Sequence, residues 1–142
     1  MYKADYTCNP FRNGGIFMIS SLAGRISDSE LAVMKVLWQA KDAISITDIR
    51  EALQESRGWE ATTIKTLVSR LVSKGAVRQE KRNVFFYSPL ISEQEYNSWA
   101  TRNLIEKLYR GSAKDMIAAL VDSESLTDSD IAELREMFRV EE

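Results

Sequence analysis

Three segments in the first half of the chain carry apolar residues at helical spacing, with polar residues between them. This spacing predicts an amphipathic helix over about residues 27–39, a second over 46–56 and a third over 61–74. Ser27 precedes Glu30 by three residues, as in a capping box, which marks the first helix start. We therefore expect three consecutive helices packed around one core.

After Gly75 the apolar period changes from helical spacing to alternation. Residues 76–80 and 84–87 are rich in β-prone side chains and flank a polar, basic segment, so they predict a hairpin with a basic tip. Pro89 is expected to close the second strand, because proline has no N–H to donate to a strand ladder. Three helices followed by a hairpin is the order of a winged helix-turn-helix, in which the third helix enters the major groove of DNA.

The last third of the chain returns to helical spacing, with a long helix from about Ser92 to Gly111 and shorter helices over 114–121 and after Thr127. These helices are too few to enclose a core, so their apolar faces favour a second copy of the chain as a partner. The residues expected at this dimer interface are Leu104, Leu108, Ile117, Leu120, Leu126, Ile131, Leu134 and Phe138.

The predicted fold class is therefore mainly α, with a winged helix-turn-helix DNA-binding domain followed by a C-terminal helical dimerisation region. We place the DNA-binding domain at residues 26–90 and the dimerisation region at 91–142. Residues 1–25 contain turn-forming Asn, Pro and Gly residues and are expected to form a flexible tail. In this tail Met18 is a candidate for the biological start, and Cys8 is interpreted as an incidental free thiol.

Formal charge is distributed unevenly along a chain whose net value is −2. Residues 57–82 carry seven basic and two acidic side chains, a net charge of +5, whereas residues 111–142 carry three basic and nine acidic ones, a net charge of −6. A basic segment that contains the third helix and the hairpin favours an anionic partner there. The acidic end is expected to keep away from DNA phosphates.

The outward face of the third helix is predicted to carry hydroxyls and cations without any acid. Exposed helices usually mix both signs of charge, so this composition indicates double-stranded DNA as the partner. For Arg70 a second interpretation stays open, in which the side chain pairs with a neighbouring acid and positions the helix indirectly. The predicted DNA-binding residues are Thr62, Thr63, Lys65, Thr66, Ser69, Arg70, Lys81 and Arg82.

Several classes of function are disfavoured by what the sequence lacks. The chain has no histidine and a single cysteine, so the usual ligands of zinc or copper are missing, and we expect neither a metal site nor another cofactor. Without histidine the commonest general base is absent as well, which argues against an enzyme. No stretch has the length and hydropathy of a membrane span, and we expect a cytoplasmic protein.

The motifs "ISDSELAVMKVLW", "WEATTIKTLVSRLVSKGAV" and "FFYSPLIS" resemble those of the penicillinase and methicillin-resistance repressors and their copper-responsive relatives, over roughly residues 26–138. The resemblance implies a homodimer on a palindromic operator with TACA and TGTA half-sites, which represses transcription until an inducing signal releases it. Its most specific part is the pattern W-x-x-x-T-I-x-T-L-x-x-R-L-x-x-K-G over residues 59–75. The resemblance implies groove and phosphate contacts from Thr62, Thr63, Lys65, Thr66 and Arg70. Lys81 and Arg82 are expected to contribute from the hairpin of residues 76–87, which is called the wing.

Three departures from the family pattern affect regulation and local contacts. The chain ends in "FRVEE", without the Cys-x-Cys tail of copper-responsive members, and it has Ala119-Leu120 where penicillinase repressors have the Asn-Phe bond cut by a sensor protease. The inducer, whether a sensor protease or another effector, therefore stays open. Glu60 replaces a common serine at the start of the third helix, and we interpret it as a cap. The alternative function is a winged-helix module that binds a protein partner.

Overall fold

The computed structural model describes residues 21–139, and the chain divides into two compact units, residues 1–100 and residues 101–142. Most of the predicted tail, with Cys8 and Met18, lies outside the described residues. The elements of the first unit are, in order, α2 (Asp28–Gln39), β1 (Ile44–Ser45), α3 (Ile46–Arg57), α4 (Ala61–Lys74), β2 (Val77–Lys81), β3 (Phe85–Pro89) and the start of α5 (Glu93–Tyr109).

The helices α2, α3 and α4 begin and end within about two residues of the predicted positions because their caps are encoded locally. The hydroxyl of Ser27 accepts from the backbone N–H of Glu30 at 3.2 Å, and the carboxylate of Glu30 accepts from the N–H of Ser27 at 3.0 Å, so the predicted capping box is present. Gly58 and Gly75 end α3 and α4 with φ of 66° and 82°, a left-handed conformation that glycine adopts without strain.

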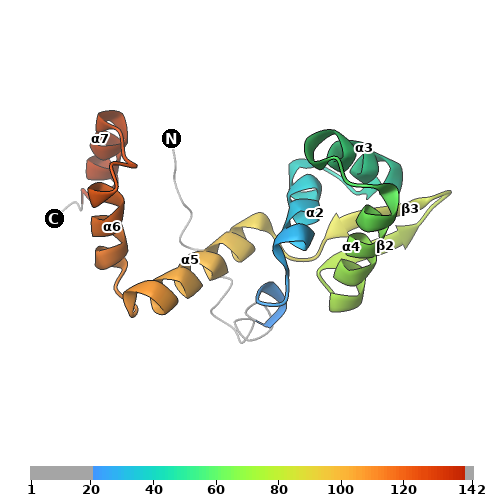
Figure 1. Cartoon of the computed structure of the whole chain (residues 1–142), viewed down its shortest axis with the longest axis horizontal. Helices are drawn as coiled ribbons and strands as arrows, with labels where there is room; N and C mark the ends of the chain where they lie inside the picture. Colours follow the sequence, from blue (N-terminus) through green and yellow to red (C-terminus); the bar gives the residue numbers. More distant parts are fainter. Residues whose placement is uncertain (1–20, 140–142) are drawn as a thin grey trace. The chain divides into compact units, whose positions relative to one another are not determined.

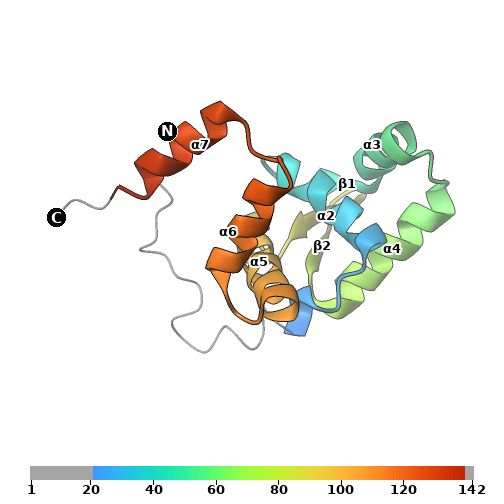
Figure 2. The same ribbon diagram turned by 60° about the vertical axis from the view of Figure 1, so that its left-hand side comes forward.

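A small antiparallel sheet has the strand order β1-β3-β2. The hairpin of β2 and β3 pairs Val77 with Pro89 and Lys81 with Phe85, so β3 ends at proline as the sequence predicts. β1 was not predicted, and it adds Ile44 to the far edge of β3, opposite Tyr87. In both views β2 lies beside α4 and β3 lies near α2, so the sheet closes the core left open by the helices (Figure 1, Figure 2).

Every residue classed as buried in the described chain belongs to the first unit. Met34, Ile49, Ile64 and Leu71 are fully buried, one or two from each of α2, α3 and α4. The core also includes Ala23, which is 1% exposed and lies before the predicted domain start at residue 26. Residues 21–23 are helical, so the part of the predicted tail that the structure describes is ordered against the core.

Helix α5 spans the division between the two units. Its first half packs against the first unit through Tyr96 and Trp99, and the ring of Tyr96 lies 5.7 Å from that of Trp38 and 5.8 Å from that of Trp99. The indole N–H of Trp38 donates to the carbonyl of Ile91 at 2.9 Å. This aromatic row attaches the first half of α5 to the first unit, which extends to residue 100. The end of the DNA-binding domain at residue 90 stays a prediction.

The second unit contains the end of α5, α6 (Ala113–Asp122) and α7 (Asp128–Met137). Ser112 caps α6, and Thr127 forms a capping box with Asp130 at the start of α7, so both short helices begin where the sequence predicts. No described residue of this unit is buried, and the element pairs that pack closely all belong to the first unit. Among residues 21–139, no helix is long and apolar enough to cross a bilayer.

Candidate nucleic-acid interface

The core determines which face of α4 points outward. Ile64, Leu67, Val68 and Leu71 recur at helical spacing and are all at least 95% buried, so they fix one face of the helix against the rest of the unit. The opposite face is exposed, and it contains every predicted contact residue of this helix. These exposed residues are Thr62, Thr63, Lys65, Thr66, Ser69, Arg70 and Ser73.

The cations on this face are available to bind an anion. Within residues 21–139, Lys65 and Arg70 form no ion pair with a carboxylate. The pairing with an acid that the sequence allowed for Arg70 is made instead by Lys74, whose ammonium lies 2.6 Å from a carboxylate oxygen of Glu30. Arg70 is therefore exposed on the outer face, and its guanidinium forms no ion pair with a carboxylate of residues 21–139.

The threonines of α4 differ in what their hydroxyls can still do. The hydroxyl of Thr66 donates to the carbonyl of Thr62 at 2.9 Å, one turn earlier in the same helix. This bond uses the only proton of the Thr66 hydroxyl, so the side chain offers its oxygen lone pairs and its methyl group to a partner. A threonine methyl group can contact the methyl group of thymine in the major groove.

Glu60 occupies the N-cap position of α4 but does not act as the cap that the sequence predicts. Its backbone is extended, with φ of −73° and ψ of 155°, yet its side chain accepts no hydrogen bond from the first turn. The first turn of α4 also carries no acidic residue. The first-turn N–H groups of α4 therefore receive no hydrogen bond acceptor from this side chain.

The wing combines cations with exposed aromatic and aliphatic side chains. Lys81 lies 6.0 Å from the ring of Phe85, and Arg82 lies 4.7 Å from the ring of Phe86. Arg82 also approaches Glu80 at 3.5 Å, with both side chains about half exposed. An exposed pair of this kind contributes little, so the Arg82 guanidinium can exchange it for a phosphate.

An open groove of about 720 Å³ joins the two predicted contact surfaces. Lys65, Thr66, Ser69 and Arg70 line it from α4, and Gln79, Phe85 and Tyr87 line it from the wing, with no acidic residue among its lining side chains. Gln79 was not among the predicted DNA-contact residues. The structure places it in this groove, where its side-chain amide donates a hydrogen bond to the hydroxyl of Tyr87 at 3.0 Å. Only the register of β2 against β3 places it there, and the sequence does not show that register.

The apolar residues predicted for the dimer interface lie on the surface of the second unit. Leu104 is 42% exposed, Leu108 is 62% exposed and Phe138 is 64% exposed. Ile117 and Leu120 are also exposed, whereas Leu126, Ile131 and Leu134 are half-buried. Val121 and Met137, which were not among the predicted interface residues, are also more exposed than Leu104.

Residues 21–139 contain no group of three or more His, Cys, Asp or Glu side chains arranged to hold a metal ion.

Comparison with known proteins identifies relatives along most of the chain. The model of the penicillinase repressor family matches residues 26–139. The methicillin resistance regulatory protein MecI of Mammaliicoccus sciuri is 35% identical over 114 residues, which cover 80% of this chain and 92% of that protein. The penicillinase repressor of Bacillus licheniformis is 32% identical over 115 residues, which cover 80% of this chain and 89% of that protein.

Among solved structures, the DNA-binding domain of the repressor BlaI is 40% identical and covers 51% of this chain and 88% of that domain, with a TM-score of 0.47. The family-model match extends from the capping box of α2 to the end of α7. It includes the helix α4, the wing and the apolar second unit described above. The chain therefore belongs to the penicillinase repressor family, which is a family of transcriptional repressors and not of enzymes.

Proposed function

We propose that this protein is a DNA-binding transcriptional repressor that binds a palindromic operator as a homodimer, with half-sites of the TACA and TGTA type, and that an inducing signal releases it. The observation that carries the proposal is the groove between α4 and the wing, which no acidic side chain lines and in which Lys65 and Arg70 form no ion pair with any described carboxylate. In this proposal α4 enters the major groove, and Lys81 and Arg82 of the wing lie against phosphates.

Electrostatics supports DNA as the partner of this surface. Each cation that neutralises a phosphate releases condensed counterions, which favours binding at low salt. The hydroxyls of Thr62, Thr63 and Ser69 are exposed beside the cations, and hydroxyls of this kind bind phosphates and base edges. The second unit, residues 101–142, carries six basic and ten acidic side chains, and its net charge of −4 makes it unsuited to the same contact.

Dimerisation is supported by the exposure of the second unit. Leucine, isoleucine, methionine and phenylalanine side chains lie on its surface while none of its described residues is buried. A second copy that covers these side chains would remove them from water. Each Å² of apolar surface buried in this way stabilises the dimer by about 25 cal/mol. A symmetric dimer would present two copies of α4, as a palindromic operator requires.

The test is a fluorescence anisotropy titration of the full chain against two labelled duplexes of equal length and composition. One duplex contains palindromic TACA and TGTA half-sites, and the other contains the same bases in scrambled order. We expect a salt-sensitive complex of one dimer per operator at nanomolar to low micromolar protein, with weaker binding to the scrambled duplex. Equal binding to both duplexes, together with a tight protein partner, would instead identify a protein-binding module.

A further inference from the structure

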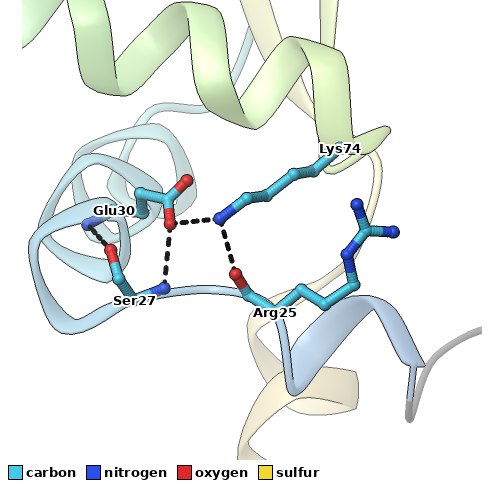
Figure 3. Close-up of polar contacts among 4 residues, drawn as sticks. All are labelled: Arg25, Ser27, Glu30 and Lys74. Atoms are coloured by element: carbon cyan, nitrogen blue, oxygen red, sulfur yellow. Dashed lines mark hydrogen bonds and ion pairs between the residues drawn. The ribbon is translucent and has the colours of Figure 1, made fainter.

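The buried carboxylate of Glu30 lies at the centre of a polar cluster at the C-terminal end of α4. The side chain of Glu30 is 2% exposed, and its Oε1 accepts hydrogen bonds from the backbone N–H of Ser27 at 3.0 Å and from the ammonium of Lys74 at 2.6 Å (Figure 3). The same ammonium donates to the carbonyl of Arg25 at 2.6 Å. One lysine therefore holds both the first turn of α2 and the segment that precedes it.

Lys74 is the last residue of α4, the helix whose outer face carries the predicted contacts. Its partners Glu30 and Arg25 lie 44 and 49 residues earlier in the sequence. The ion pair thus joins the C-terminal end of α4 to the N-terminal end of α2 (Figure 3). Lys74 also lines the groove that Lys65 and Arg70 line, and its side chain is 24% exposed, but its ammonium is engaged by the carboxylate of Glu30.

This arrangement is costly for a residue that serves stability alone. Removing a carboxylate and an ammonium from water costs about as much as their attraction returns, and apolar residues of similar volume often stabilise a fold equally well. Glu30 also has a second oxygen, Oε2, that is buried without a hydrogen-bond partner among the described residues. The ion pair of Glu30 and Lys74 therefore contributes little net stability, and its more important effect is to orient the two helices that it joins.

We infer that Glu30 and Lys74 are positioning residues for operator recognition, because their ion pair fixes the direction of α4 relative to α2. The inference rests on the proposed function, in which α4 reads the major groove. Helix α4 has 14 residues and is about 21 Å long, so a tilt of about 3° displaces one end by about 1 Å. A displacement of this size is enough to spoil directed hydrogen bonds to base edges while leaving contacts with phosphates largely intact.

The experiment compares the wild-type chain with the double variant Glu30→Leu/Lys74→Met on the operator and scrambled duplexes over a salt series. The double variant keeps the net charge of the chain, so long-range attraction to DNA is unchanged. We expect its preference for the operator over the scrambled duplex to fall by about tenfold, comparable with the cost of a mismatched base pair, while the salt dependence of binding stays that of the wild type.

Two further variants separate positioning from other effects. Lys35→Met/Glu51→Leu removes the same two charges from exposed positions of α2 and α3 and should keep the wild-type preference. Glu30→Gln retains the oxygen that accepts from Ser27 and Lys74, so it should keep most of the preference. Circular dichroism verifies the fold of each variant, and Glu30→Gln/Lys74→Met replaces the double variant if that protein fails to fold.

A folded double variant with the wild-type preference would overturn the inference. So would a fall of about one in the salt slope for both duplexes, since Lys74 would then contact a phosphate directly. A preference in Glu30→Gln as low as in the double variant would also contradict positioning through these hydrogen bonds. A wild-type chain without any operator preference would overturn the proposed function itself, which is a different result from each of these.

Discussion

The two units of the chain use apolar residues in opposite ways. In the first, residues such as Ile49 and Leu53 are at most 1% exposed, and the helices and the sheet close around them. In the second, Leu108 and Phe138 are more than 60% exposed although they recur at the same helical spacing. An amphipathic pattern therefore predicts a helix in both units, but only the number of packed elements decides whether its apolar face is buried within one chain.

The largest expected effect is on the core of the first unit. Leu53→Ala should lower the free energy of unfolding by about 2–5 kcal/mol, because it removes buried methyl groups and leaves a cavity. Urea denaturation followed by circular dichroism measures this change. Leu108→Ala is the matched control in the second unit, where we expect a change below about 0.5 kcal/mol at protein concentrations that keep the chain monomeric. Similar losses in both variants would remove the contrast between the units.

The next effect concerns the apolar surface of the second unit. Leu108→Glu should weaken dimerisation by about a hundredfold, or about 2.7 kcal/mol, because a carboxylate would have to be buried in the interface. Sedimentation equilibrium measures the dimer dissociation constant. Leu90→Glu makes the same change at a leucine that is 57% exposed in the first unit, and it should leave dimerisation unchanged. Equal effects of the two substitutions would argue against the second unit as the dimer interface.

A smaller effect is expected at the cationic face of α4. Lys65→Ala should weaken binding to the operator and the scrambled duplex by a similar factor and reduce the salt slope by about one, if the contact of Lys65 is to a phosphate alone. Anisotropy titrations at four or more salt concentrations provide the slope. Lys35→Ala removes an exposed lysine of α2 and serves as the control. A loss confined to the operator would mean that Lys65 contacts a base.

The smallest effect is on stability as a function of pH. Burial by itself raises the pKa of Glu30, but the hydrogen bonds from Lys74 and Ser27, with the charge of Lys74, outweigh it and hold that pKa below its ordinary value of 4.5. A lowered folded-state pKa means that the charged carboxylate stabilises the fold at neutral pH. This contribution is lost as the pH falls from 4.5 through the folded-state pKa. The opposing effect of burial keeps it small.

Glu30→Gln should therefore lose less stability than the wild type between about pH 7 and about pH 3, as measured by urea denaturation at each pH. Glu51→Gln replaces an exposed carboxylate of α3 and is expected to lose as much stability as the wild type over this range. Parallel pH profiles of the wild type and Glu30→Gln would show that the carboxylate makes no such contribution.

Local signals in the sequence were sufficient to predict the positions of the helices and the hairpin. Ser27 and Thr127 each cap a helix where they were expected to, because a cap involves residues only three positions apart. The strand β1 was missed since two residues cannot display alternation, and it exists only through its pairing with β3. Likewise, the helical pattern of residues 93–109 does not show that Tyr96 packs against the first unit while Leu108 stays exposed.

The exposed face of α4 followed from the positions of its buried residues, so the exposure of Lys65 and Arg70 could be predicted. The long-range contacts of the candidate site could not. Glu30 was recognised as part of a capping box, but its pairing with Lys74 joins residues 44 positions apart. Glu60 shows the converse, because its position suggested a cap and its side chain does not form one. For both glutamates the hydrogen bonds that form depend on the orientation of the side chain, which the sequence does not show.

The aromatic row of Trp38, Tyr96 and Trp99 has a consequence for spectroscopy. The chain has three tryptophans, and the third is Trp59, also in the first unit beside the start of α4. Intrinsic tryptophan emission therefore reports on the first unit alone, because the sequence has no tryptophan beyond residue 100. An emission change on adding operator DNA would be assigned to that unit without a label. Dimerisation through the second unit would be measured separately, from the molar mass in sedimentation equilibrium.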